Sequence, residues 1–216
     1  DEIISNIGTD PDAPFFAFLS YTSAHNPLHV PQTYFEKYRG RFDAGWDALA
    51  TSRLARQKEL GLATELQTPH PRPDWVMAWN ELTSEQKASR ARDMEIHAGM
   101  IDYMDEQIKR VFDYLKEIGE YENTLIVFFS DNGANGAPPT AYPGQTEAHL
   151  HSFDNSLDNR GLKNSYIEQG PGWAQVSMVP SRMFKAFTSE GGIKSPLLVK
   201  LPGKMANAGT MNHSFL

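Results

Sequence analysis

The sequence predicts an α/β fold, and three observations lead to that class. First, residues 14–22, 124–130 and 196–201 form short, nearly continuous apolar runs. Such runs are typical of strands that are buried on both faces of a sheet. Second, residues 84–118 carry a helical periodicity. Third, the order of strand, helices, strand and strand is typical of a sheet flanked by helices.

The three apolar runs are expected to be buried strands of one mixed or parallel sheet. The first run is rich in aromatic residues. Each run is followed by residues that favour turns, and these turns end at Pro27, Gly133 and Gly203.

Two segments are expected to be helical. Residues 46–60 contain neither Pro nor Gly and stop before Gly61, a residue type that commonly follows the end of a helix. Residues 84–118 follow Thr83, which can cap a helix while Gln86 reaches back to it in a capping box.

The longer helix is expected to bury one apolar stripe and to end near Gly119. The stripe consists of Met94, Ala98, Ile101, Ile108, Phe112, Leu115 and Ile118. Because a helix of about 35 residues is long for a globular domain, we expect a kink or break at residues 89–92.

Residues 133–180 are rich in Gly, Pro, Asn and Ser and show no sustained period. Loops of this length inside a domain are uncommon and are usually functional or disordered. Aromatic residues such as Tyr142 and Trp173 argue against disorder. We therefore expect a long loop region that shapes a substrate pocket.

The composition excludes several classes of function. The chain has 216 residues, with 20 Lys and Arg against 27 Asp and Glu. This acidic balance argues against nucleic acid or an anionic membrane as the main partner. No run approaches the ~18 apolar residues of a membrane span, and the first twelve residues do not resemble a secretory signal. The absence of cysteine excludes disulfides and thiolate nucleophiles, so any metal must be bound by oxygen or imidazole ligands.

Reactive residue types follow two of the expected strands, where ligands bind in open α/β sheets. His25 follows the first strand, and Asp131 and Asn132 directly follow the second. Carboxylate and amide oxygens suit a hard cation such as Ca²⁺ or Mg²⁺. Asp-Asn-Gly could instead be a hairpin turn, but the residues after it do not alternate as a strand would.

The other histidines give weaker indications of metal binding. His25 and His29 stand four residues apart, a zinc-ligand spacing on a helix, but Pro27 and Pro31 disfavour a helix there. His149 and His151 would share a face only on a strand, and their surroundings predict a loop, so we do not include them in the site.

Lys185 precedes the paired glycines Gly191 and Gly192, which suit a tight passage of the backbone. Its ammonium group, flanked by aromatic residues, could be directed at an anion. Taken alone, Lys185 fits an ordinary surface lysine better than an anion-binding one.

Three segments together resemble the sulfatase family, and its arylsulfatase branch in particular. Residues 14–27 combine a strand with Ala-His-Asn-Pro, and residues 123–133 end in Ser-Asp-Asn-Gly. Residues 185–196 contain Lys-Ala-Phe-Thr-Ser-Glu-Gly-Gly. Residues 46–61 also resemble an arylsulfatase insertion, so the similarity runs across most of the chain.

This resemblance implies a sulfate-ester hydrolase that has the alkaline-phosphatase-like fold, here as a partial domain, and binds one Ca²⁺. Asp131 and Asn132 would be ligands of the metal. His25 would contact the sulfate and help the leaving group depart, and Lys185 would hold the sulfate or the leaving oxygen. The expected partner is a small-molecule sulfate ester.

The sequence departs from the family in one large respect. The family's nucleophile is a formylglycine made within Cys/Ser-x-Pro-x-Arg, and no such motif occurs in this chain. The aspartate pair that completes the calcium shell is also missing, as are the upstream Lys and His. We therefore expect residues 1–216 to be an interior part of a sulfatase catalytic domain, truncated at both ends and inactive alone.

Two alternatives stay open at this point. One is a phosphatase or phosphodiesterase of the same superfamily with a Ser or Thr nucleophile and two zinc ions, although the pair Asp131 and Asn132 departs from that pattern. The other is a non-catalytic binding module that lost its nucleophile. The sequence fits a soluble protein of cytoplasm or periplasm and leaves the compartment, the oligomeric state and the natural substrate undetermined.

Overall fold

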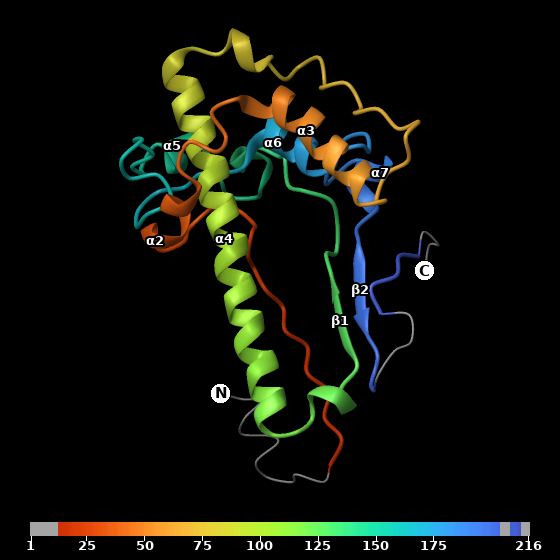
Figure 1. Ribbon diagram of the computed structural model, residues 1–216. Coiled ribbons are helices and arrows are strands. Elements are labelled where there is room, and N and C mark those ends of the chain that lie inside the picture. The colour runs from red at the N-terminus through yellow and green to blue at the C-terminus, as the bar shows by residue number, and fades with distance from the viewer. Residues whose placement is uncertain (1–12, 204–207, 213–216) are drawn as a thin grey trace.

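Figure 1 shows the fold as a computed structural model, which describes residues 13–203 and 208–212. The helices are α2 (Gln32–Phe35), α3 (Gly45–Glu59), α4 (Ser84–Glu117), α5 (Glu147–Leu150), α6 (Gly170–Ser177) and α7 (Glu190–Ile193). Short 3₁₀ turns are η1 (Glu36–Tyr38), η2 (Trp79–Glu81), η3 (Tyr121–Asn123) and η4 (Pro139–Ala141). The strands are β1 (Ile126–Phe129) and β2 (Leu197–Lys200).

The two strands pair with each other in an antiparallel sheet, in which Ile126 faces Lys200 and Phe129 faces Leu197. Strands are therefore present within two of the expected runs, 124–130 and 196–201. The expected strand at 14–22 is wrong, because these residues form no ladder with β1 or β2. They have no regular secondary structure instead, as the trace in Figure 1 shows.

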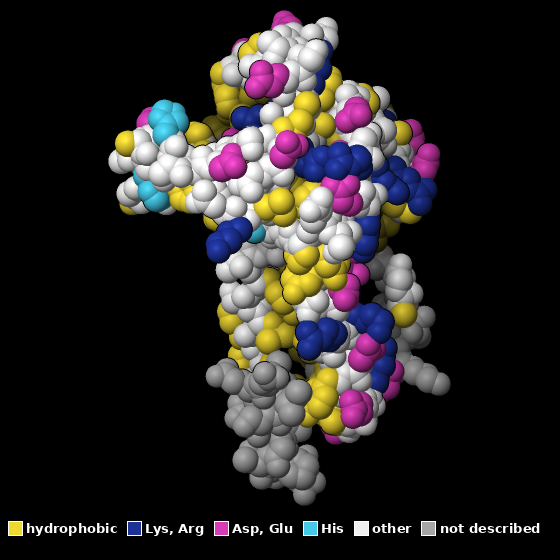
Figure 2. Space-filling view, turned by 90° about the vertical axis from the view of Figure 1, so that its left-hand side faces the viewer, with side chains coloured by type: hydrophobic (Ala, Val, Ile, Leu, Met, Phe, Trp, Pro, Cys, Tyr) yellow, Lys and Arg dark blue, Asp and Glu magenta, His cyan; other side chains and the backbone are white. Residues whose placement is uncertain are grey.

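The expectation that the strands are buried is also wrong for the described part of the chain. Most side chains of β1 and β2 are exposed, including Phe128 at 42% and Leu198 at 58%. Figure 2, which views the molecule from the side away from these strands, shows that hydrophobic side chains are also exposed elsewhere in the narrow lower part. The apolar pattern thus marks a sheet whose faces the described elements leave largely uncovered.

Helix α4 begins with the expected capping box. The Gln86 amide N–H donates to Thr83 Oγ1 at 3.2 Å, and the Thr83 amide N–H donates to Gln86 Oε1 at 2.9 Å. The helix then runs without interruption to Glu117, so the expected break at 89–92 is wrong. Its length is supported by packing of the first half, where Met94 is buried, whereas Ile101 in the same predicted stripe is 44% exposed.

Glycines in the left-handed conformation end both long helices, as the sequence predicts. Gly61 follows α3 with φ of 71°, and Gly119 follows α4 with φ of 80°. After each helix the next three amide N–H groups donate to carbonyl groups of the helix's last turn. This arrangement satisfies carbonyls that would otherwise lack a partner.

The region 133–180 is more ordered than a single long loop. It contains η4, α5 and α6, and α6 packs against α3. Trp173 of α6 is fully buried, and its indole N–H donates to the Arg90 carbonyl oxygen at 2.8 Å. It belongs to a set of three packed indole rings with Trp46 and Trp79, whose centroids lie 4.8–5.5 Å apart.

The buried core therefore lies in the helical part of the molecule, around α3, α6 and the first half of α4. A second apolar cluster joins this helix half to the segment after His25, through Leu28, Val30, Phe35, Ile96, Met100 and Ile167. Within the described residues, no helix is both long and apolar enough to cross a membrane.

Candidate functional site

His25 and Lys185 meet, although 160 residues separate them in the sequence. Lys185 Nζ lies 3.2 Å from His25 Nε2, and His25 Nδ1 lies 2.8 Å from the Asn26 carbonyl oxygen. An ammonium group can only donate, and a carbonyl oxygen can only accept. The contacts therefore require the hydrogen of the neutral imidazole on Nδ1, with the Nε2 lone pair directed at Lys185.

Several contacts hold the turn that carries His25. Its amide N–H donates to the Thr22 carbonyl oxygen at 2.9 Å. The next residue, Asn26, accepts a hydrogen bond at 2.5 Å from the amide of Asn135. The ring of Tyr142 lies edge-on to the His25 ring, with 5.9 Å between centroids. Asn135 and Tyr142 thus bring the region 133–180 to the predicted histidine.

Lys185 is positioned by a segment that the buried side chain of Gln175 holds in place. Gln175 donates to the Ser181 carbonyl oxygen and accepts from the Met183 amide N–H, both at 2.9 Å. The Lys185 amide N–H donates to the Ala134 carbonyl oxygen at 3.0 Å, which links it to the residues after β1. Met183 and Ala186 have φ of 60° and 76°, an unfavourable region for residues with a side chain. Backbone strain of this kind concentrates at functional sites.

The paired glycines allow the tight backbone passage that the sequence indicated. The Gly133 amide N–H donates to the Gly192 carbonyl oxygen at 3.0 Å. A Cβ atom at Gly133 would lie 1.8 Å from the Gly191 carbonyl oxygen, so a side chain cannot fit there without a backbone shift. The end of β1 is thereby fixed to α7.

Asp131 and Asn132 lie directly after β1, as expected. Within the described residues, the Asp131 carboxylate has no hydrogen-bond or ion-pair partner. The Asn132 amide donates to the Gly133 carbonyl oxygen at 3.0 Å, which leaves its Oδ1 available. These two oxygens are ligands of the kind that Ca²⁺ prefers, but Ca²⁺ takes six to eight.

No group of three or more His, Cys, Asp or Glu side chains suited to a metal occurs among residues 13–203 and 208–212. The metal roles of Asp131 and Asn132 and the catalytic roles of His25 and Lys185 therefore stay predictions. The structure brings His25 and Lys185 into contact and ties Lys185 to the backbone just beyond Asp131 and Asn132.

Two hollows of the surface are not lined by any of these four residues. One, of about 450 Å³, is lined by residues around His29 and Leu162, and another, of about 190 Å³, by residues around Trp46 and His70. Neither is lined by His25 or Lys185.

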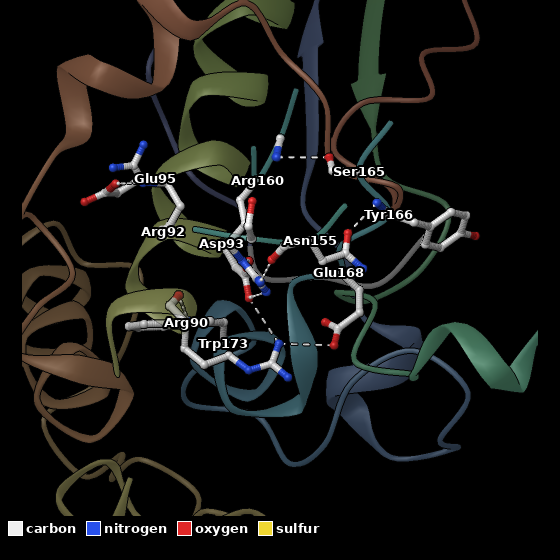
Figure 3. Close-up of polar contacts among 12 residues, drawn as sticks. Arg90, Arg92, Asp93, Glu95, Asn155, Arg160, Ser165, Tyr166, Glu168 and Trp173 are labelled. Atoms are coloured by element: carbon white, nitrogen blue, oxygen red, sulfur yellow. Dashed lines mark hydrogen bonds and ion pairs between the residues drawn. The ribbon is translucent and has the colours of Figure 1, made fainter. Parts of the chain in front are cut away.

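A largely buried network of charged side chains links α4 to residues 160–168 (Figure 3). Asp93 of α4 is fully buried and contacts Arg160 twice, at 2.7 Å and 3.2 Å, and Arg90 at 3.1 Å. Arg90 also contacts Glu168 at 3.1 Å. Burial raises the pKa of Glu168, and the neighbouring Arg90 charge partly offsets that rise. The network fastens residues 160–168 to α4.

Sequence reasoning missed Asn26, Asn135, Tyr142 and Gln175. Asn135 and Tyr142 lie in a segment without periodicity, where no local pattern marks a residue that contacts Asn26 or His25. Asn26 lies within the Ala-His-Asn-Pro motif, and its place beside His25 was a usable signal.

The structure thus brings the Lys185 ammonium and the His25 imidazole together and bonds the Lys185 backbone to Ala134, two residues after Asn132. The sequence pattern of the sulfatase family matches residues 1–216, and the chain belongs to that family. The resemblance described above is thus confirmed.

Two relatives illustrate the similarity. The chain is 47% identical over 190 residues to an uncharacterized sulfatase of Schizosaccharomyces pombe. The aligned residues make up 87% of this chain and 34% of the relative. It is 37% identical over 196 residues to an arylsulfatase of Klebsiella aerogenes. This alignment includes 90% of this chain and 42% of that relative. The chain therefore spans less than half the length of either relative.

Proposed function

We propose that the complete protein containing this chain hydrolyses sulfate esters in the manner of an arylsulfatase. The observation that carries the proposal is the 3.2 Å contact between Lys185 Nζ and His25 Nε2. Membership of the sulfatase family and the similarity to a protein named arylsulfatase support the same reaction class.

The paired side chains fit the chemical demand of the reaction. When a sulfate ester is cleaved, negative charge develops on the leaving oxygen, and a fixed cation or a proton donor offsets it. The Lys185 ammonium supplies the charge directly. Its proton can also pass to His25 Nε2 and from there to the leaving oxygen, while the Nδ1 hydrogen stays on the Asn26 carbonyl and keeps the ring oriented.

Asp131 and Asn132 would supply two of the oxygen ligands of a Ca²⁺ ion, and the remaining ligands would come from outside this chain. The cation would neutralise charge on the sulfate oxygens. The expected formylglycine nucleophile would also lie outside the chain, because no residue in the sequence provides its motif. The isolated chain is accordingly proposed to bind a sulfate ester without turning it over.

The test is the activity of His25→Ala and Lys185→Ala variants of the complete protein on aryl sulfates with good and poor leaving groups. General acid assistance is typically worth about 10²–10⁴-fold, so each variant should lose turnover by about that range on a poor leaving group. The loss should shrink for a leaving group of low pKa, which needs less protonation.

His151→Ala and Lys163→Ala change exposed residues of the same two types and serve as controls. Both should keep the parent's turnover. Wild-type rates in both site variants on the poor leaving group would remove His25 and Lys185 from the mechanism. A complete protein that hydrolyses aryl phosphates but not aryl sulfates would contradict the proposed reaction itself.

A further inference from the structure

His29 is held by a contact that the predicted chemistry does not use. Its Nε2 lies 2.8 Å from the Ser165 carbonyl oxygen and 3.2 Å from Ser165 Oγ. Because a carbonyl oxygen only accepts, the hydrogen of the His29 imidazole must be on Nε2. His29 is thus the opposite tautomer to His25, four residues earlier, and it is oriented away from the zinc role that the spacing suggested.

The partner of His29 is itself well fixed. Ser165 is 1% exposed, and its hydroxyl donates to the Leu162 carbonyl oxygen at 2.8 Å and accepts from the Gly161 amide N–H at 3.1 Å. Beside this contact, the Leu28 amide N–H donates to the Ile167 carbonyl oxygen at 3.0 Å. Hydrogen bonds therefore join residues 28–29 to residues 165–167.

Further contacts connect these two segments to α4. Arg160 binds the buried carboxylate of Asp93, and its Nη1 donates to the Asn155 carbonyl oxygen at 2.7 Å. The side chain of Asn155 accepts from the Tyr166 amide N–H at 2.7 Å, next to Ser165 (Figure 3). The contacts thus lead from the rigid helix to the residues that hold His29.

We propose that His29 is a positioning residue for His25. The His29–Ser165 and Leu28–Ile167 bonds fix the chain just after the turn, and Pro27, with its restricted φ, connects them to His25. His25 is held from the other side by Lys185 and, through Asn26, by Asn135. In this proposal His25 faces the reacting group, and His29 connects the turn to the helical core.

The first test needs no substitution and no activity. Nitrogen NMR of the complete protein with labelled histidine, at a pH where the imidazoles are neutral, distinguishes the two tautomers. We expect His25 as the Nδ1–H form and His29 as the Nε2–H form. An Nδ1–H tautomer at His29 would overturn the inference, whatever reaction the protein catalyses.

The second test compares His29→Leu, which removes the donor, with His29→Gln, which keeps a side-chain N–H for the Ser165 carbonyl. His151→Leu, the same change at an exposed histidine, is the matched control. A small misplacement of a reacting group can cost about 10²-fold in rate. We expect His29→Leu to lower kcat on a poor leaving group by about 10- to 100-fold, with a much smaller change in KM and a mixture of His25 tautomers.

His29→Gln should recover most of kcat and the single His25 tautomer, and His151→Leu should resemble the wild type. A folded His29→Leu protein with wild-type kcat and an unchanged His25 spectrum would overturn the inference, as would a loss that His29→Gln does not restore. If His29→Leu does not fold, the tautomer of wild-type His29 decides. The kinetic comparison rests on the proposed function, whereas the tautomers do not, so failure of one can be told from failure of the other.

Discussion

The carboxylate of Asp93 is completely buried, and Arg160, 67 positions later in the chain, binds both of its oxygens. Arg90 adds a third contact to the same group. A buried ion pair adds little net stability compared with an apolar pair, but loss of one partner leaves a charge buried and uncompensated. The pair therefore makes the docking of residues 155–168 onto α4 sensitive to a single substitution.

Asp93→Ala should destabilise the complete protein by about 3–5 kcal/mol, because Arg160 and Arg90 lose their buried counter-charge. Thermal unfolding measures the effect. Asp113→Ala removes an acid from an exposed pair with Lys109 on the same helix and should cost at most about 1 kcal/mol. Equal costs for the two variants would mean that the buried network does not hold this region.

Gly133→Ala should lower both stability and turnover. The added Cβ would lie 1.8 Å from the Gly191 carbonyl oxygen, and overpacking of this kind costs about 1–3 kcal/mol or more. The required backbone shift also moves the chain between Asp131 and Lys185. Gly119→Ala is a suitable control, because its Cβ would meet nothing within 4 Å and only its positive φ is strained. It should lower stability and leave turnover unchanged, and the same pattern for Gly133→Ala would contradict the prediction.

His97 should make the protein less stable in mild acid. Burial, and to a smaller degree the Arg53 charge, lowers its pKa from 6.5 to about 4. Between these values the unfolded chain binds a proton that the folded chain does not, so stability is fully present above pH 6.5 and falls as the pH drops towards 4. The loss is about 3 kcal/mol, at roughly 1.4 kcal/mol per pKa unit.

Denaturant unfolding of the complete protein at several pH values measures this dependence. His97→Gln should flatten the curve over that range, because it removes the titrating group. His151→Gln, at an exposed position, should leave the slope unchanged. A wild-type slope in His97→Gln would show that other groups cause the acid sensitivity.

Calcium should bind weakly to the isolated chain and more tightly to the complete protein. Asp131 and Asn132 offer two oxygens, and Ca²⁺ takes six to eight. Calorimetry on both forms gives the two affinities. Asp131→Ala should weaken binding to the complete protein, and Asp158→Ala, an exposed aspartate away from β1, should not. Tight binding that survives Asp131→Ala would place the metal elsewhere.

Local patterns predicted the elements whose signals lie within one segment. The capping box at Thr83 and the glycines after α3 and α4 correctly marked helix ends, because those contacts involve neighbours in the sequence. The apolar runs at 124–130 and 196–201 correctly marked two strands, which are somewhat shorter than the runs. The expected break in α4 was wrong. The helix is longer than is usual in a globular domain, but its first half is packed in the core and its backbone hydrogen bonds continue without a gap.

The remaining errors concern contacts between segments that are far apart in the sequence, which no local sequence pattern reveals. Residues 14–22 have a strand-like composition, but a strand also needs a neighbour, and within the described residues β1 and β2 pair only with each other. Helix α6 was missed because its glycines and proline resemble a loop, although Trp173 is buried against α3 and α4. The contact of His25 with Tyr142 and that of Asn26 with Asn135 likewise depend on tertiary structure.

The uneven burial of the chain determines which part of the site unfolds first. His25 is tied through His29 to the densely packed helical part, whereas Asp131 follows a strand with little buried surface of its own. Regions with few buried apolar contacts open at a lower free energy than packed cores. The two halves of the site thus belong to units of different local stability. Amide hydrogens of β1 should exchange before those of α4, and the site should be disassembled while the tryptophan cluster is still intact.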